Sequence, residues 1–252
     1  ALSIDEASAV RSFHCADGEL CFRFQLEETA GLGGMGQGGS NAGDNGVGES
    51  ASALAFDHSG RRLLVGRQDG KVRVYNFSSG QCLAECIPPA GHGSGLGAHA
   101  CEISCVMGLR DGNLSYIVAC GWSREVWVWP DQRDGLGFTV EPLHCMKGHR
   151  EDVTCLGYCC PNMLASGGFD GQVMMWNLSS GTPRGKALDH EPLKKAESDG
   201  STGPSAFVKS EGMTVCVEQL TFINLLNETP SPMLVSAGSD ARLRFWSVVS
   251  ST

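Results

Sequence analysis

The sequence has no surplus of positive charge, no long apolar run and no C-x-x-C pair of cysteines. Its 252 residues carry a formal net charge of −9, so we expect no surface for nucleic acid. Without an apolar run of 18 residues or a signal-peptide core, we expect a soluble, cytoplasmic chain that does not contact a membrane. The 12 cysteines include no C-x-x-C, and most lie in strand-like runs, where a free cysteine packs as a small apolar residue.

Two local patterns imitate cofactor sites without their context. Cys155, Cys159 and Cys160 beside His149 are the best candidate for a metal cluster, but no second pair of cysteines sits at zinc-ribbon spacing. The glycines of Gly31-x-Gly33-x-x-Gly36 have the spacing of a dinucleotide fingerprint, yet no helical period follows them, so no helix end can meet a phosphate. We therefore expect no metal and no cofactor, and we interpret the glycine-rich stretch as a loop.

The sequence does contain many short apolar runs separated by turn residues, which favours an all-β fold. The clearest example is 148–181, GHREDVTCLGYCCPNMLASGGFDGQVMMWNLSSG. It predicts strands at 153–158, 163–166 and 172–177, with turns at Pro161-Asn162 and around Asp170.

This stretch resembles a WD40 repeat, one blade of a β-propeller. Gly148-His149 stands at its head and Trp176-Asn177 where the family has Trp-Asp. The resemblance implies that His149, Ser166, Asp170 and Trp176 form a buried hydrogen-bond network, in which each polar group needs a partner. Ser, His and Asp also suggest a hydrolase triad, but no G-x-S-x-G elbow presents the serine, so we expect no catalytic residue.

Other parts of the chain align with this repeat less completely. Val65 and Ala119 stand where the serine is expected, Ser123 replaces the turn aspartate, and the last repeat lacks a histidine at the expected position. Trp127 and Trp129 fall on one strand face, as inter-blade packing or, alternatively, as an aromatic cage for methyl-lysine. The partial networks comprise Asp69, Tyr75, His99, Trp129, Ser236, Asp240 and Trp246.

We therefore predict a WD40 β-propeller segment over 1–252 with about four complete four-stranded blades and a partial N-terminal blade. The partial blade is 1–25, and the complete blades are at about 52–83, 99–130, 148–181 and 213–250. A glycine-rich insertion at 27–50 and a polar insertion at 182–212 lengthen the loops between blades. Since propellers of this family usually have more blades, we expect the segment to belong to a larger propeller.

A finer resemblance concerns 148–181 together with VACGWSREVWVW, residues 118–129, one blade earlier. These stretches are similar to ciliary WD-repeat proteins of the WD repeat protein 49 and 64 type. The resemblance implies a non-catalytic scaffold that binds segments of other proteins, axonemal ones among them, in a cilium or flagellum. Alternatives are a modified-peptide reader or adaptor of a chromatin or ubiquitin-ligase complex, and a redox-sensing module that uses Cys159 and Cys160.

Overall fold

The computed structural model describes residues 2–4, 9–13, 16, 19–25, 50–89, 101–131, 139–190, 193–195, 207–209, 215–223 and 232–248. Every regular element in these residues is a β-strand, which confirms the all-β prediction. None of them forms a helix long and apolar enough to cross a membrane. The chain divides into two compact units, residues 1–123 with 127–143, and residues 124–126 with 144–252.

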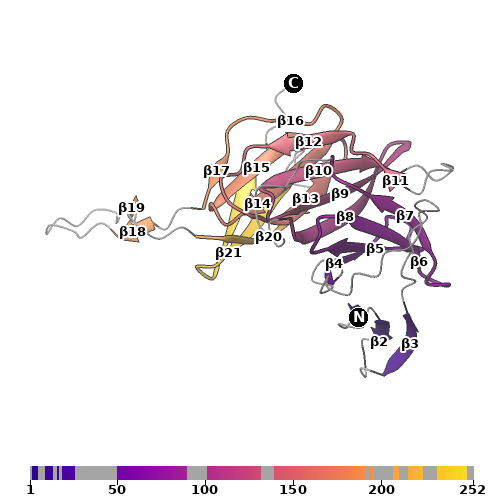
Figure 1. Ribbon diagram of the computed structural model, residues 1–252. Coiled ribbons are helices and arrows are strands. Elements are labelled where there is room, and N and C mark those ends of the chain that lie inside the picture. The colour runs from indigo at the N-terminus through magenta and orange to yellow at the C-terminus, as the bar shows by residue number, and fades with distance from the viewer. Residues whose placement is uncertain are drawn as a thin grey trace, which may run out of the picture. The chain divides into compact units, whose positions relative to one another are not determined.

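The first unit contains successive antiparallel sheets, coloured indigo to magenta in Figure 1. The N-terminal sheet has the order β1–β2–β3, with β1 (Leu2–Ile4), β2 (Ala9–Phe13) and β3 (Leu20–Gln25). The next sheet has the order β11–β7–β6–β5–β4, in which the short β11 lies parallel to β7. Its strands are β4 (Ala51–Phe56), β5 (Arg62–Arg67), β6 (Val72–Asn76), β7 (Cys82–Cys86) and β11 (Thr139–Val140).

A third sheet has the order β12–β10–β9–β8. Its strands are β8 (Ile103–Asp111), β9 (Leu114–Gly121), β10 (Glu125–Pro130) and β12 (His144–Lys147). The division between the units passes through this sheet, because the start of β10 and all of β12 belong to the second unit.

The second unit is built mainly on two further sheets. One has the order β13–β14–β15–β16, and β17 also pairs with β15; the other has the order β20–β21–β22. The strands of the first are β13 (Val153–Cys159), β14 (Met163–Gly168), β15 (Gln172–Asn177), β16 (Thr182–Pro183) and β17 (Leu188–Asp189). Those of the second are β20 (Val217–Ile223), β21 (Met233–Gly238) and β22 (Arg242–Ser247), and β18 (Leu193–Lys195) forms a separate ribbon with β19 (Phe207–Lys209).

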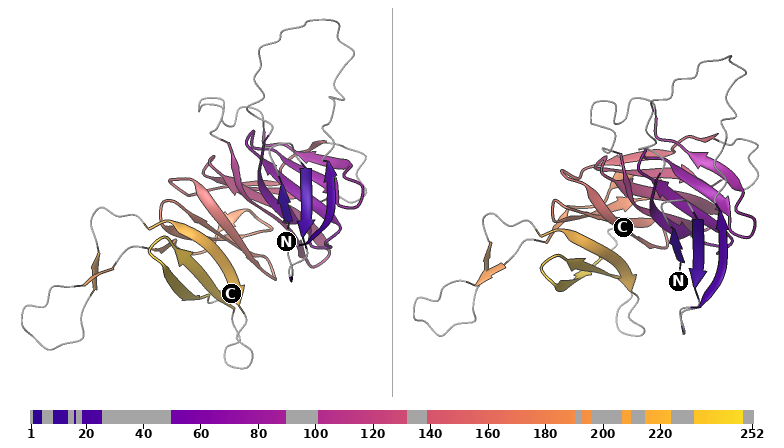
Figure 2. Two further views of the ribbon diagram at one scale, coloured as in Figure 1. Left: turned by 90° about the horizontal axis from the view of Figure 1, so that it is seen from below. Right: turned by 60° about the horizontal axis from the view of Figure 1, so that its bottom comes forward.

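These two sheets of the second unit pack face to face, as the pink and yellow strands of Figure 2 show. Cys155, Val173 and Met175 from one sheet meet Leu220 and Leu234 from the other in a single buried cluster. Alternation of apolar side chains along each strand places these residues on the shared face. The buried core of the second unit therefore lies between these two sheets, which correspond to neighbouring blades.

A glycine lets the sheets approach closely at the centre of this packing. A Cβ on Gly167 would come within 2.5 Å of the Val217 side chain and 2.9 Å of Cys155 Sγ. Such contacts are closer than atoms can come, so a side chain here would separate the sheets.

The observed sheets agree with the predicted propeller segment. Three sheets have at least one strand beyond their third, whereas the last has three strands among the described residues. Much of the predicted insertion 27–50 lies outside the described residues. The predicted insertion 182–212 contains β16, β17, β18 and β19, so it is partly built into strands.

Candidate functional site

The first candidate site lies on the sheet β13–β16. His149 precedes β13, Ser166 is on β14, Asp170 is in the turn after β14, and Trp176 is on β15. The structure brings all four together. His149 Nδ1 lies 3.1 Å from both oxygens of Asp170, and His149 Nε2 lies 2.8 Å from Ser166 Oγ. Trp176 Nε1 donates to the same Oγ at 2.8 Å.

The hydrogen-bond chain leaves no polar atom of Ser166 available for chemistry. Its side chain is fully buried between the histidine and the indole. Since the carboxylate can only accept, His149 Nδ1–H donates to Asp170, and in the neutral ring Nε2 accepts the serine hydroxyl proton. The arrangement ties the loop before β13 to the sheet. It does not present a nucleophile.

Asp170 is held as an ion inside this network. Burial alone raises the pKa of its carboxyl, but the hydrogen bonds from His149 and from the backbone amides of Arg150 and Gln172 bring it below the usual value. An ionised carboxylate that accepts several hydrogen bonds is a strong orienting group for the imidazole.

A glycine next to the network makes room for the histidine. A Cβ on Gly168 would lie 2.8 Å from the Asp152 carbonyl oxygen, 3.0 Å from Asp170 Oδ1 and 3.1 Å from His149 Nδ1. Any larger residue would push against the ring or its aspartate, so this network requires glycine here.

A second network lies on the sheet β20–β22. Trp246 Nε1 donates to Ser236 Oγ at 2.7 Å, and the same oxygen contacts Nε2 of His190. His190 is fully buried. No histidine stands at the expected sequence position of this repeat, and His190 fills the role from within the predicted polar insertion.

Strand pairing places His190 despite its distance in sequence. Leu188 and Asp189, which form β17, pair with β15, and the His190 amide donates to the Gly171 carbonyl at 2.7 Å. Residues 191–216 then separate the histidine from β20, so it lies 46 positions before its serine, against 17 for His149. The available sequence signal was that no other histidine occurs between Trp176 and Ser236.

The two networks differ in the group that faces Nδ1 of the histidine. In the second network Arg244 donates to His190 Nδ1 at 2.9 Å, and it also donates to Asp240 at 2.7 and 3.1 Å. Because a guanidinium can only donate, the His190 proton is on Nε2. Burial, and then the charge of Arg244, lower the pKa of His190 to about 4. The hydrogen bond from Arg244 lowers the pKa of Asp240.

The sheet β4–β7 has no histidine in the described residues before β4, and an arginine lies next to the aspartate of this repeat. Arg67 occupies the position that Gly168 has in its repeat, is 5% exposed, and lies with Nε 3.6 Å from Asp69 Oδ1. Tyr75 packs with Leu63 and Val65, so the serine–indole contact is replaced by apolar packing.

The sheet β8–β10 also lacks the serine, and its tryptophan has a different hydrogen-bond partner. Ala119 offers no hydroxyl, and Trp129 Nε1 donates instead to the Ile87 carbonyl oxygen at 3.3 Å. His99 lies outside the described residues. Trp127 and Trp129 are 2% and 0% exposed, with ring centroids 6.3 Å apart. This burial favours a packing role over an aromatic cage.

The cysteines among the described residues show no arrangement for metal or thiol chemistry. No group of three or more His, Cys, Asp or Glu in the described part of the chain could hold a metal ion. Burial raises the pKa of the Cys159 thiol, and the neighbouring Cys160 adds to this. A raised pKa makes the reactive thiolate scarcer, which disfavours the redox interpretation.

Comparison with known proteins agrees with this architecture. The model of the WD domain, G-beta repeat, matches residues 140–177, and that of the anaphase-promoting complex subunit 4 WD40 domain matches residues 17–107. The sheets and the networks define a β-propeller repeat protein. These matches support a WD40 β-propeller family for the chain, and WD40 repeats imply a scaffold for protein–protein interaction and are generally non-catalytic.

Several curated proteins are similar to the chain. Actin-interacting protein 1 of Caenorhabditis elegans is 26% identical over 200 residues, 79% of this chain and 26% of that protein. Ribosome biogenesis protein ytm1 of Aspergillus clavatus is 25% identical over 215 residues, 80% of this chain and 41% of that protein. The chain thus spans less than half of these relatives.

Among solved structures, the computationally designed Ika8 protein is 17% identical with a TM-score of 0.53. The match covers 100% of this chain and 56% of that one. At this identity the likeness supports the fold alone.

Proposed function

We propose that the chain is a non-catalytic scaffold that binds segments of other proteins. The observation that carries this proposal is the complete internal use of His149, Ser166 and Asp170. These are the residues whose types would suit hydrolysis, yet the serine is fully buried and hydrogen-bonded to the histidine and to an indole. What the repeat leaves free for function is its loops.

We further propose that the partners include axonemal proteins of a cilium or flagellum. The support is the similarity of 148–181 and 118–129 to ciliary WD-repeat proteins of the 49 and 64 type. The names of the relatives point to other settings for those proteins, actin interaction and ribosome biogenesis. The experiment must therefore separate these possibilities.

Affinity capture from a ciliated and a non-ciliated cell line tests both the scaffold function and the axonemal partners. The tagged protein is the bait, and mass spectrometry identifies the co-purifying chains. We expect reproducible protein partners from both lines and tubulin-associated axonemal proteins from the ciliated line. Recovery of actin regulators, ribosome-assembly factors or chromatin and ubiquitin-ligase subunits instead would contradict the axonemal setting, and capture of no partner would contradict the scaffold.

A further inference from the structure

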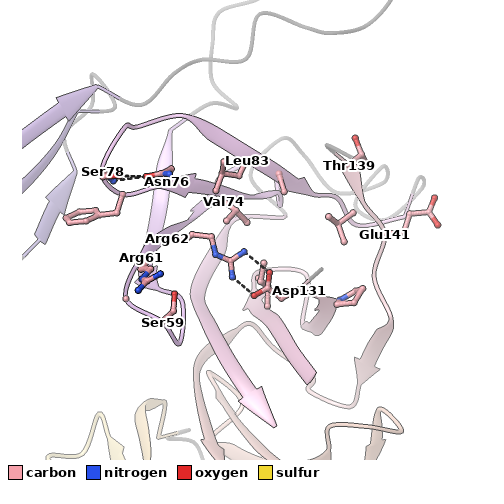
Figure 3. A pocket seen from close by; sticks show the side chains of 16 residues that line it. Ser59, Arg61, Arg62, Val74, Asn76, Ser78, Leu83, Asp131, Thr139 and Glu141 are labelled. Carbon is pink, nitrogen blue, oxygen red and sulfur yellow. Dashed lines mark hydrogen bonds and ion pairs between the residues drawn. The ribbon is translucent and has the colours of Figure 1, made fainter. Parts of the chain in front are cut away.

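A groove of about 950 Å³ lies within the first unit. Its walls come from the turn between β4 and β5, the β6–β7 hairpin, the end of β10, and β11 with the residue after it (Figure 3). This volume is at the upper end of the range of about 300–1,000 Å³ typical of ligand sites.

The middle of the groove is apolar. Val74, Leu83, Ala84, Ile117 and Val140 line it. Val74 and Ile117 are buried in the sheets, whereas Leu83 is 41% exposed and is available to a ligand. A large exposed leucine inside a concave surface is a favourable contact for another apolar side chain.

The polar side chains deep in the groove satisfy one another. Arg62 donates to Asp131 at 2.8 Å and forms an ion pair with Asp57 at 3.0 Å. Ser59 donates to Asp57 at 2.7 Å. A small polar metabolite would find no buried group waiting to orient it, so the recognition of such a molecule is disfavoured.

Two exposed charges of opposite sign border the apolar part. Arg61 comes from the β4–β5 turn and Glu141 follows β11, and Figure 3 shows them on opposite sides of the groove. Neither side chain has an ion pair with another described residue. The groove thus presents positive charge, apolar surface and negative charge in sequence.

We propose that this groove binds an extended peptide segment of a partner protein with an acidic residue, an apolar middle and a basic residue. The acidic residue meets Arg61, the apolar middle covers Leu83, and the basic residue meets Glu141. The complementarity of charge is what fixes the class of ligand and its direction. This inference rests on the proposed scaffold function and names a site for it.

The probes are acetylated, amidated and fluorescently labelled peptides of about six residues, long enough to span roughly 20 Å when extended. One set reads acidic, apolar, basic; a second reverses the charges; a third replaces both charges by glutamine. Fluorescence anisotropy with the full chain should show binding of one charged order, and about tenfold weaker binding of the reversed and neutral sets.

Charge-reversal variants locate the binding. Arg61→Glu or Glu141→Lys should weaken the preferred peptide about tenfold, and the double variant should prefer the opposite charge order. Arg150→Glu and Glu218→Lys are matched controls, because both side chains are exposed and lie in the other unit. Thermal unfolding equal to wild type shows that each variant is folded.

Two results overturn the inference: equal affinity for both charge orders, or unchanged affinity in the double variant. The affinity capture separates this failure from that of the scaffold. If wild type and the double variant capture the same partners, the groove inference is wrong and the scaffold stands. If neither captures any partner, the scaffold itself fails.

Discussion

The two histidine networks of the second unit have the same plan but orient their histidines in opposite ways. His149 donates through Nδ1 to the carboxylate of Asp170. His190 accepts at Nδ1 from a guanidinium, and its own carboxylate neighbour, Asp240, is occupied by that arginine. Asp170 therefore orients its histidine ring directly, whereas Asp240 acts on His190 through Arg244.

This difference between the two histidines follows from the residue that pairs with the serine on the neighbouring strand. Ser166 pairs in register with Met174, and Ser236 pairs with Arg244. The methionine has no donor, so the aspartate reaches the histidine. The arginine has five donors and enters between them. A position that the repeat pattern leaves variable thus decides the protonation of a buried group in the network.

The largest expected effect comes from filling the space that the first histidine needs. Gly168→Ala should lower the free energy of unfolding by about 3 kcal/mol, because the added Cβ displaces His149 or Asp170 and breaks their hydrogen bonds. Gly157→Ala on the neighbouring strand is the control, since its nearest atoms would be 3.4 Å away or more. Equal stability of both variants would contradict the packing described. Urea unfolding gives the comparison.

A pH-dependent loss of stability of similar size is expected from His190 in the second network. His190 has a pKa of about 4 when folded and 6.5 ordinarily. The unfolded chain therefore binds this proton first, and the stability that His190 contributes above pH 6.5 is lost as the pH falls toward 4. The loss amounts to about 3 kcal/mol. In urea unfolding from pH 7.5 to 4.5, His190→Gln should flatten this part of the profile; a parallel profile would rule the contribution out.

The two aspartates should differ in importance. Asp170→Ala leaves a buried histidine without its orienting partner and should cost about 2 kcal/mol. Asp240→Ala removes a partly exposed ion pair with Arg244 and should cost about 1 kcal/mol. Thermal and urea unfolding of the two variants measure the difference. A larger loss of stability in Asp240→Ala than in Asp170→Ala would contradict this ranking of the two aspartates.

The smallest change in stability is expected from making the networks alike. Arg244→Met copies Met174 and should alter the free energy of unfolding by less than about 1 kcal/mol. It removes a positive charge beside the ring and frees Asp240, so the pKa of His190 should rise from about 4. An NMR titration of the imidazole shifts measures this. A pKa that stays near 4 would show that burial alone sets it.

The repeat pattern predicted much of the architecture because strand alternation and turn residues are local signals. Residues 148–181 contain every element of one repeat, and the strands found there lie close to the predicted ones. The roles of Ser236 and Trp246 also followed from local position. The histidine of their repeat did not, since pairing between β17 and β15 places His190 across an insertion.

Two other features depend on contacts that spacing does not reveal. Trp129 donates to a backbone carbonyl far along the chain. The groove with Arg61 and Glu141 likewise arises because β11 pairs with β7, which lies far earlier in the sequence. Long-range pairing, rather than local propensity, made these features invisible in the sequence.

The most direct test of the comparison is a long-range ¹H–¹⁵N NMR spectrum of the histidine rings at neutral pH. His149→Gln and His190→Gln variants assign the two sets of signals. From the hydrogen bonds of the two rings we predict opposite neutral tautomers, with the proton of His149 on Nδ1 and that of His190 on Nε2. The same tautomer in both rings would contradict it, because one carboxylate or one guanidinium would then not be where the hydrogen bonds place it.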